Sequence, residues 1–194
     1  MGKVVVVNHV TLDGVMQGPG RPDEDTRDGF EHGGWATQRS DEIMADKVSE
    51  WMGGEHAFLF GRRSYEDMLQ AWNRMGGPYK DGLNQAQKYV ASRSSATTLE
   101  WPNSTLLSGD VRAAVAKLTE SSDGDLVIMG SGELIGSLMD VGMIDVFVLM
   151  IHPLVLGTGR RLFGHANRPA ELDLVESIPT TTGVILATYR PGRV

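Results

Sequence analysis

Residues 125–139 read DLVIMGSGELIGSLM, and this stretch indicates the class of the fold. The run Asp125–Met129 is short, apolar and rich in branched side chains, which is typical of a buried strand. It passes directly into the turn Gly130-Ser131-Gly132-Glu133. Beyond the turn, four apolar residues recur at helical spacing: Leu134, Ile135, Leu138 and Met139. A strand, a glycine turn and a helix in immediate succession predict an α/β fold.

Comparable units extend in both directions from this stretch. The predicted strands are Lys3–Val10, His56–Phe60, Lys88–Ala91, Thr105–Leu107, Asp125–Met129, Asp145–Ile151, Glu171–Ile178 and Val184–Tyr189. Helices are predicted after a cap at Ser40, after Ser64, over Asp81–Gln87, from Val111 and from Leu134. We therefore expect one domain over residues 1–194, with a mixed, mostly parallel eight-stranded sheet, helices on both faces and an antiparallel C-terminal hairpin.

A long connection, residues 11–39, separates the first predicted strand from the first helix. It contains glycines, prolines and acidic residues, together with the aromatic residues Phe30 and Trp35. Connections longer than about 12 to 15 residues inside a compact domain are usually functional or mobile. We expect a lid or a pocket wall here, with Trp35 as a substrate-binding residue.

The composition narrows the possible functions. The net charge of −7 disfavours an extended surface for nucleic acid or for an anionic membrane. The chain has no cysteine, which excludes thiol catalysis and cysteine-containing zinc sites. No segment has the apolar length of a signal peptide or a membrane span, and we expect a cytoplasmic protein. No metal site is expected either, because no two of the five histidines have the short sequence spacing of a metal-binding pair. They are His9, His32, His56, His152 and His165.

Three turns that follow predicted strands are candidates for anion binding. They are Gly61-Arg62-Arg63-Ser64, Ser92-Arg93 and Gly130-Ser131-Gly132-Glu133-Leu134. In open α/β sheets, ligands bind at the carboxyl ends of the strands, and a helix N-terminus favours an anion. Alternatively, Ser64 only caps its helix, the arginines are solvated, and the last turn is a tight connection. A Rossmann domain is disfavoured, because Gly136 comes one residue too late for the G-x-G-x-x-G fingerprint.

Five ordered motifs cover nearly the whole chain. They are Thr11-Leu12-Asp13-Gly14, Phe60-Gly61-Arg62-Arg63-Ser64-Tyr65-Glu66, Ala91-Ser92-Arg93, Val127-Ile128-Met129-Gly130-Ser131-Gly132 and Ile151-His152-Pro153-Leu154-Val155-Leu156-Gly157-Thr158-Gly159. In order and spacing they resemble the dihydrofolate reductase superfamily. The last motif, which continues into Arg160-Arg161-Leu162-Phe163, is similar to the reductase domain of riboflavin biosynthesis and its stand-alone bacterial relatives. The resemblance implies a dihydrofolate reductase-like fold.

The resemblance also implies that NADPH binds across the strand ends. The pyrophosphate and the 2′-phosphate would lie near Gly61, Arg62, Arg63 and Ser64, with Ser92 and Arg93 at the 2′-phosphate. The bridging phosphates and the nicotinamide half would lie beside Gly130, Ser131, Gly132, Glu133 and Leu134. The implied activity is hydride transfer to a small heterocycle, carbonyl or imine, with the ribosylamino-pyrimidine phosphate of riboflavin synthesis as one substrate. A homodimer built through β-rich surfaces is also implied.

The substrate end of the site is less defined. Arg160 and Arg161 are candidates for holding an anionic group of the substrate, and Asp13 is a candidate catalytic residue. Asp13 before a glycine is equally good turn chemistry. Two other functions stay open: an NADP(H)-binding module without turnover, and a dihydrofolate reductase. The folate enzymes carry their proton-donating carboxylate on the first helix, where this chain offers Asp41, Glu42 and Asp46.

Overall fold

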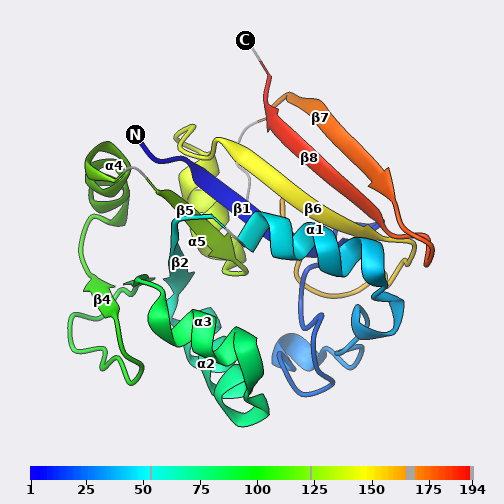
Figure 1. Cartoon of the computed structure of the whole chain (residues 1–194), viewed down its shortest axis with the longest axis horizontal. Coiled ribbons are helices and arrows are strands. Elements are labelled where there is room, and N and C mark those ends of the chain that lie inside the picture. Colours follow the sequence, from blue (N-terminus) through cyan, green and yellow to red (C-terminus); the bar gives the residue numbers. More distant parts are fainter. Residues whose placement is uncertain (53, 123, 165–168, 193–194) are drawn as a thin grey trace.

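One eight-stranded sheet runs through the molecule in the order β4-β3-β2-β5-β1-β6-β8-β7 (Figure 1). The computed structural model describes residues 1–52, 54–122, 124–164 and 169–192. The strands are β1 (Val4–Thr11), β2 (His56–Gly61), β3 (Lys88–Ala91), β4 (Ser104–Leu107), β5 (Asp125–Met129), β6 (Val146–His152), β7 (Leu172–Pro179) and β8 (Ile185–Pro191). Strands β1 to β6 run parallel to one another, whereas β8 is antiparallel to both β6 and β7. The predicted mostly parallel sheet with an antiparallel C-terminal hairpin is confirmed.

Helices cover both faces of the sheet, as expected. One face packs against α1 (Glu42–Met52), α2 (Arg62–Met75) and α3 (Gly77–Gln85), and the other against α4 (Val111–Ser121) and α5 (Gly132–Met139). Successive side chains of β1 point to opposite faces of the sheet. Val6 packs with the apolar cluster of α4 and α5, and Val7 packs with that of α1 to α3. A strand buried on both faces reads as a continuous apolar run, which is the pattern of residues 4–7.

The starts of three helices differ from the expectation. The cap of α1 is Asp41 rather than Ser40, because the Asp41 carboxylate accepts a hydrogen bond from the Met44 N–H at 2.9 Å. Helix α2 already begins at Arg62, so Ser64 lies inside its first turn and does not cap it. Helix α3 begins at Gly77 instead of Asp81. Its first turn contains Pro78, which has no N–H that would need a partner and whose ring fixes a helical φ.

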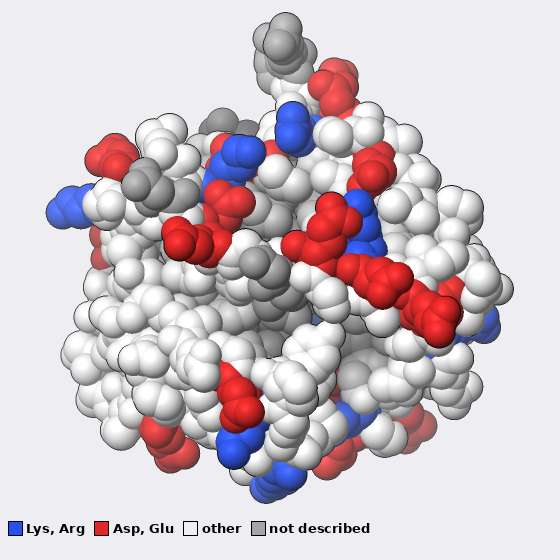
Figure 2. All heavy atoms as spheres, in the orientation of Figure 1, with Lys and Arg blue, Asp and Glu red and all other residues white. Residues whose placement is uncertain are grey.

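The surface carries side chains of both charges. Figure 2 shows acidic and basic side chains intermixed on this face, with a row of acidic groups over α1. Glu42, Asp46 and Glu50 are exposed on this helix at a spacing of four residues. Among the helices that the structure describes, none is long and apolar enough to cross a membrane.

Candidate active site

A cleft of about 1030 Å³ opens at the carboxyl ends of the parallel strands. Its floor includes His9 of β1, Met129 of β5 and Met150 of β6, and its walls include the turns after β2 and β3. A smaller cavity of about 450 Å³ lies at the opposite ends of the strands, beside Glu55 and Gly124. Because ligands of open α/β sheets bind at the carboxyl ends, the larger cleft is the candidate active site.

A serine joins the turn after β2 to the turn after β5. The Ser131 Oγ accepts a hydrogen bond from the Gly61 N–H at 2.7 Å and donates one to the Ser64 Oγ at 2.9 Å. The Gly130 N–H donates to the Asn8 Oδ1 at 2.9 Å. A Cβ on Gly61 would lie 2.9 Å from the Ser131 Oγ, so only glycine permits this approach. These bonds hold the ends of β1, β2 and β5 in one fixed arrangement.

Two helix N-termini without a side-chain cap line this part of the cleft. Helices α1 and α4 are capped by Asp41 and Asp110, whereas α2 and α5 have no capping side chain. Gly130 and Ser131 have φ values of 82° and 65°, and these two consecutive left-handed residues turn the chain sharply from β5 into α5. The first N–H groups of α2 and α5 are therefore available to an anion in the cleft.

Arginines gather at the side of the cleft formed by the turns after β2 and β3. Gly61 and Ala91 are register partners in β2 and β3, so Arg62 and Ser92 emerge next to each other from neighbouring strands. Arg62 forms an exposed ion pair within α2 at 2.9 Å. Arg63 has no ion pair with any residue that the structure describes. This end of the cleft therefore combines two guanidinium groups with a serine hydroxyl.

A carboxylate bridges two further arginines across the rim. Glu133 lies 3.1 Å from Arg93 and 3.8 Å from Arg160, which also contacts Asp28 at 2.9 Å. The Arg93 side chain is 95% exposed, so its ion pair is weak and easily exchanged. These guanidinium groups are therefore available to a more highly charged anion.

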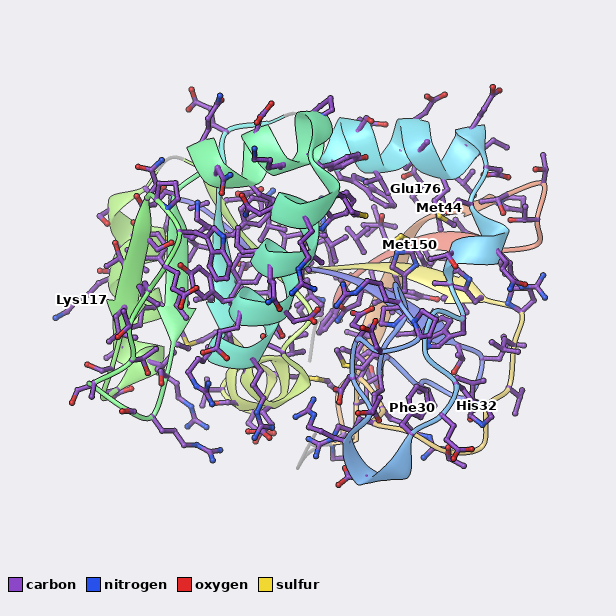
Figure 3. The ribbon with its side chains drawn as sticks, turned by 90° about the horizontal axis from the view of Figure 1, so that it is seen from below. Phe30, His32, Met44, Lys117, Met150 and Glu176 are labelled. Carbon is purple, nitrogen blue, oxygen red and sulfur yellow. The ribbon has the colours of Figure 1, made fainter. Side chains whose placement is uncertain are left out.

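The other end of the cleft is mostly apolar. The side chains there come from β1, α1, β5 and β6 and are Val7, Val48, Trp51, Met129 and Met150. Figure 3 shows Met150 next to Met44 of α1, with the loop that carries Phe30 and His32 below them. The imidazole of His9 also lies in this lining. A planar, uncharged ring suits such a surface.

The long connection forms one wall of the cleft, as expected. Gln17 organises it: its amide donates to the backbone oxygens of Asp25 and Arg27, and its side-chain oxygen accepts from the Arg160 N–H at 2.9 Å. The Gln17 backbone oxygen accepts the Trp35 indole N–H at 2.8 Å. Trp35 itself does not line the cleft and instead packs its ring against His152.

Asp13 also lies outside the cleft. Its carboxylate accepts hydrogen bonds from the Thr11 hydroxyl at 2.6 Å and from the N–H groups of Leu156 and Gly157 at 3.2 and 2.9 Å. The hydrogen bond from Thr11, followed by those from the backbone, lowers the pKa of Asp13 to about 2. Arg161 donates to the Asp13 backbone oxygen at 2.9 Å. Asp13 therefore joins two loops as an ionised group, which agrees with the turn interpretation.

We expect Asp13→Asn to lower the free energy of unfolding by about 1 to 2 kcal/mol at pH 7, because the amide is a weaker acceptor than the carboxylate. A pKa that is lower in the folded state stabilises the protein above pH 3.8, and this contribution is lost as the pH falls toward 2. The difference between variant and wild type in urea unfolding should therefore shrink over that pH range. A constant difference would contradict this role.

The comparisons with known proteins agree with this geometry. Residues 2–186 match the model of the RibD C-terminal domain. The chain belongs to the RibD C-terminal domain family. A Bacillus subtilis (strain 168) protein, the uncharacterised protein YyaP, is 26% identical over 96% of this chain and 94% of its own length.

Two solved structures show the same fold as this RibD C-terminal domain protein. A candidate riboflavin biosynthesis protein from Shewanella sp. PV-4 has a TM-score of 0.75 at 22% identity, with both chains fully covered. Dihydrofolate reductase from Enterococcus faecalis, in complex with NADP(H) and RAB-propyl, has a TM-score of 0.65 at 12% identity, over 99% of this chain and 98% of its own. The predicted dihydrofolate reductase-like fold is thus confirmed.

Most predicted site residues of this RibD C-terminal domain protein meet in the cleft. These are Gly61, Arg62, Arg63, Ser64, Ser92, Arg93, Gly130, Ser131, Gly132, Glu133, Leu134, Arg160 and Arg161. Asp13 and Trp35 do not line it. No cluster of potential metal ligands occurs among the described residues, and His165 lies outside them.

Sequence reasoning missed many residues that line the cleft, among them Asn8, His9, Glu24 and Trp51. Asn8 and His9 are polar residues in an otherwise apolar run, and this is the sequence signal that could have identified them. Glu24 is largely enclosed, and burial raises the pKa of its carboxyl. It accepts hydrogen bonds from the N–H groups of Gly20 and Arg21, so it also fixes the wall loop. No sequence pattern identified this half-buried acid.

Proposed function

We propose that this protein is an NADPH-dependent reductase that transfers a hydride to a small heterocyclic, carbonyl or imine substrate. One observation carries the proposal: the N-termini of α2 and α5, neither with a side-chain cap, line one cleft and are joined through Ser131. Two such termini suit the two charges of a pyrophosphate. When bound, the cofactor supplies the hydride from its nicotinamide ring.

The glycines of the cleft support close approach of a dinucleotide to the backbone. A Cβ on Gly132 would lie 3.0 Å from the Met16 sulfur, and one on Gly130 would lie 3.3 Å from the Ser64 Oγ. Side chains at these positions would fill the cradle where backbone N–H groups are exposed. Arg62, Ser92 and Arg93 are the residues that we assign to the 2′-phosphate, because they follow adjacent strands.

Riboflavin-type reduction is the substrate class that we propose from the family and from the likeness to the Shewanella protein. Such a substrate carries a phosphate, and Arg160 is the better candidate to hold it. Among the described residues, its guanidinium pairs with the exposed carboxylates of Asp28 and Glu133, whereas Arg161 is committed to the Asp13 backbone oxygen. The apolar end of the cleft would receive the heterocycle and exclude water from the reacting atoms.

A dihydrofolate reductase activity is less well supported. Helix α1 contributes Val48 and Trp51 to the cleft, whereas Asp41, Glu42 and Asp46 do not line it. Asp41 is instead committed to the cap of α1 and to Thr181, whose hydroxyl donates to it at 2.6 Å. The first helix therefore supplies no carboxylate for protonating folate. A binding module without turnover remains as the second candidate.

The proposal is tested by parallel titration of the protein with NADPH and NADH, followed by tryptophan fluorescence. Trp51 lines the cleft and is the expected reporter, rather than Trp35. We expect NADPH to bind at least about tenfold more tightly than NADH, because charge-assisted hydrogen bonds to its 2′-phosphate add to the affinity. Oxidation of NADPH by a carbonyl or imine acceptor distinguishes a reductase from a module without turnover. Equal affinity for the two cofactors, or no binding of either, contradicts the proposal.

We further propose that the protein forms a homodimer through its C-terminal hairpin. Leu174 and Val175 of the edge strand β7 and Ile185 of β8 are exposed apolar residues. An edge strand also presents unpaired backbone groups. We expect Val175→Lys to give a monomer in sedimentation equilibrium and Val155→Lys, an exposed position outside the hairpin, to leave the dimer intact. A monomeric wild type, or a dimer in both variants, contradicts the proposal.

A further inference from the structure

A pair of histidines lies at the apolar end of the cleft, away from the phosphate-binding turns. His9 of β1 lines the cleft, and its Nδ1 lies 2.9 Å from the Nε2 of His152 on β6. Thr11 is the register partner of His152, so His9 lies diagonally opposite His152 on the same face of the sheet. His152 is fully buried, with the Trp35 ring packed perpendicular to it at 5.1 Å. Neighbouring strands therefore hold the pair in place.

The hydrogen bond between the two rings fixes where their hydrogens lie. Only one hydrogen fits between the two nitrogens, so one ring donates and the other accepts. The Nδ1 of His152 is enclosed and has no hydrogen-bond partner among the described residues. If His9 donated, His152 would carry a buried N–H on this Nδ1 without an acceptor, which costs more than a vacant lone pair. His152 therefore donates from Nε2, and His9 carries its hydrogen on its own Nε2.

The Nε2 of His9 is open to the cleft. It is not enclosed, and it makes no hydrogen bond to a described residue. Burial, together with the neighbouring His152, lowers the pKa of His9 to about 3. Burial and the nearby Arg39 lower the pKa of His152 to about 4. Both rings are therefore neutral at pH 7, and His9 presents an uncharged N–H donor to the cleft.

We infer that His9 is a substrate-contacting hydrogen-bond donor and that His152 is the positioning residue that fixes its tautomer. The inference rests on the proposed reductase function and specifies the hydride acceptor. This acceptor is an uncharged heterocycle that presents a carbonyl oxygen to His9. An amino group at the same place would meet a second donor and be rejected. The surrounding Val7, Val48 and Met150 favour the uncharged ring itself.

The tautomer is measured by NMR on protein with ¹⁵N-labelled histidines, without any ligand. We expect the hydrogen of His9 on Nε2 in the wild type. His152→Gln should preserve this form, because the glutamine amide donates to the same Nδ1. His152→Leu removes the donor and should give a mixture of tautomers that titrates closer to the ordinary histidine range. A wild-type His9 with its hydrogen on Nδ1, or identical spectra of His9 in both variants, overturns the inference.

Recognition is measured by the binding of two probes in the presence of NADP⁺. Aminouracil carries ring carbonyl oxygens, and triaminopyrimidine carries amino groups in their place. We expect the wild type to bind aminouracil at least about tenfold more tightly, which is the effect of one hydrogen bond to a buried site. His9→Phe should reduce this preference to less than about threefold, and His32→Phe, on the exposed part of the wall loop, should leave it unchanged.

The outcomes separate this inference from the proposed function. If NADPH binds and His9→Phe leaves the probe preference intact, or if aminouracil does not bind, the inference fails while the cofactor assignment stands. If neither NADPH nor NADP⁺ binds, the proposed function fails. The tautomer of His9 in the free protein still decides whether His152 positions it as described.

Discussion

Replacement of Arg93 with alanine is expected to weaken NADPH binding by about ten- to a hundredfold while leaving the affinity for NADH nearly unchanged. The 2′-phosphate is the only group that distinguishes the two cofactors. Arg93 follows β3, directly beside the β2 turn that carries Arg62. Among the residues that the structure describes, Arg93 pairs with one exposed carboxylate, that of Glu133, and a phosphate dianion competes well with this partner.

The matched control for Arg93→Ala is Lys117→Ala. Lys117 is an exposed cation on α4, and Figure 3 places it at the far end of the molecule from Met150 of the cleft. Lys117→Ala removes the same charge as Arg93→Ala, so a general effect of net charge would weaken NADPH binding in both variants. Fluorescence titration at fixed ionic strength makes the comparison meaningful, because phosphate contacts are screened by salt. An equal loss of NADPH and NADH affinity in Arg93→Ala would exclude a 2′-phosphate site at this residue.

The largest effect on stability is expected from Gly159→Ala in the loop after β6. Gly159 has a φ of 106°, a conformation that alanine rarely adopts. A Cβ there would lie 2.7 Å from the Phe30 ring and 2.8 Å from the Val15 side chain, both of which are buried. Backbone strain and overpacking together should lower the free energy of unfolding by about 2 to 4 kcal/mol. The midpoint of urea denaturation measures this loss.

Gly157→Ala in the same loop is the control. Gly157 has a φ of 74°, so alanine is strained there as well, but a Cβ would meet no atom within 4 Å. The variant should lose only about 1 to 2 kcal/mol, the usual cost of a left-handed residue other than glycine. The difference between the two variants therefore measures how tightly this loop packs against the wall residues Val15 and Phe30. Equal losses of unfolding free energy in the two variants would mean that Val15 and Phe30 accommodate the added methyl group without destabilising the protein.

Local patterns predicted the elements of the fold and the strand-end turns that line much of the cleft. Runs of apolar residues identified β1 and β5, and helical spacing identified the buried faces of α2 and α5. Both signals depend on residues a few positions apart, which is why one sequence sufficed. Helix starts were less certain, since Asp41 rather than Ser40 caps α1. Adjacent serine and aspartate residues are both good caps, and only the backbone geometry selects between them.

Long-range partners decided the roles of individual polar residues. Asp13 and His9 both follow from the sequence as polar residues near the end of β1. Tertiary structure commits Asp13 to the N–H groups of residues 156 and 157, and it joins His9 to His152 across 143 positions of the chain. Hydrogen-bond partners and burial set the pKa and tautomer of such groups. The sequence by itself therefore determined which segments form strands, helices and glycine turns, because periodicity is local. Only the tertiary structure decided which polar side chains face the cleft, because their partners lie on distant strands.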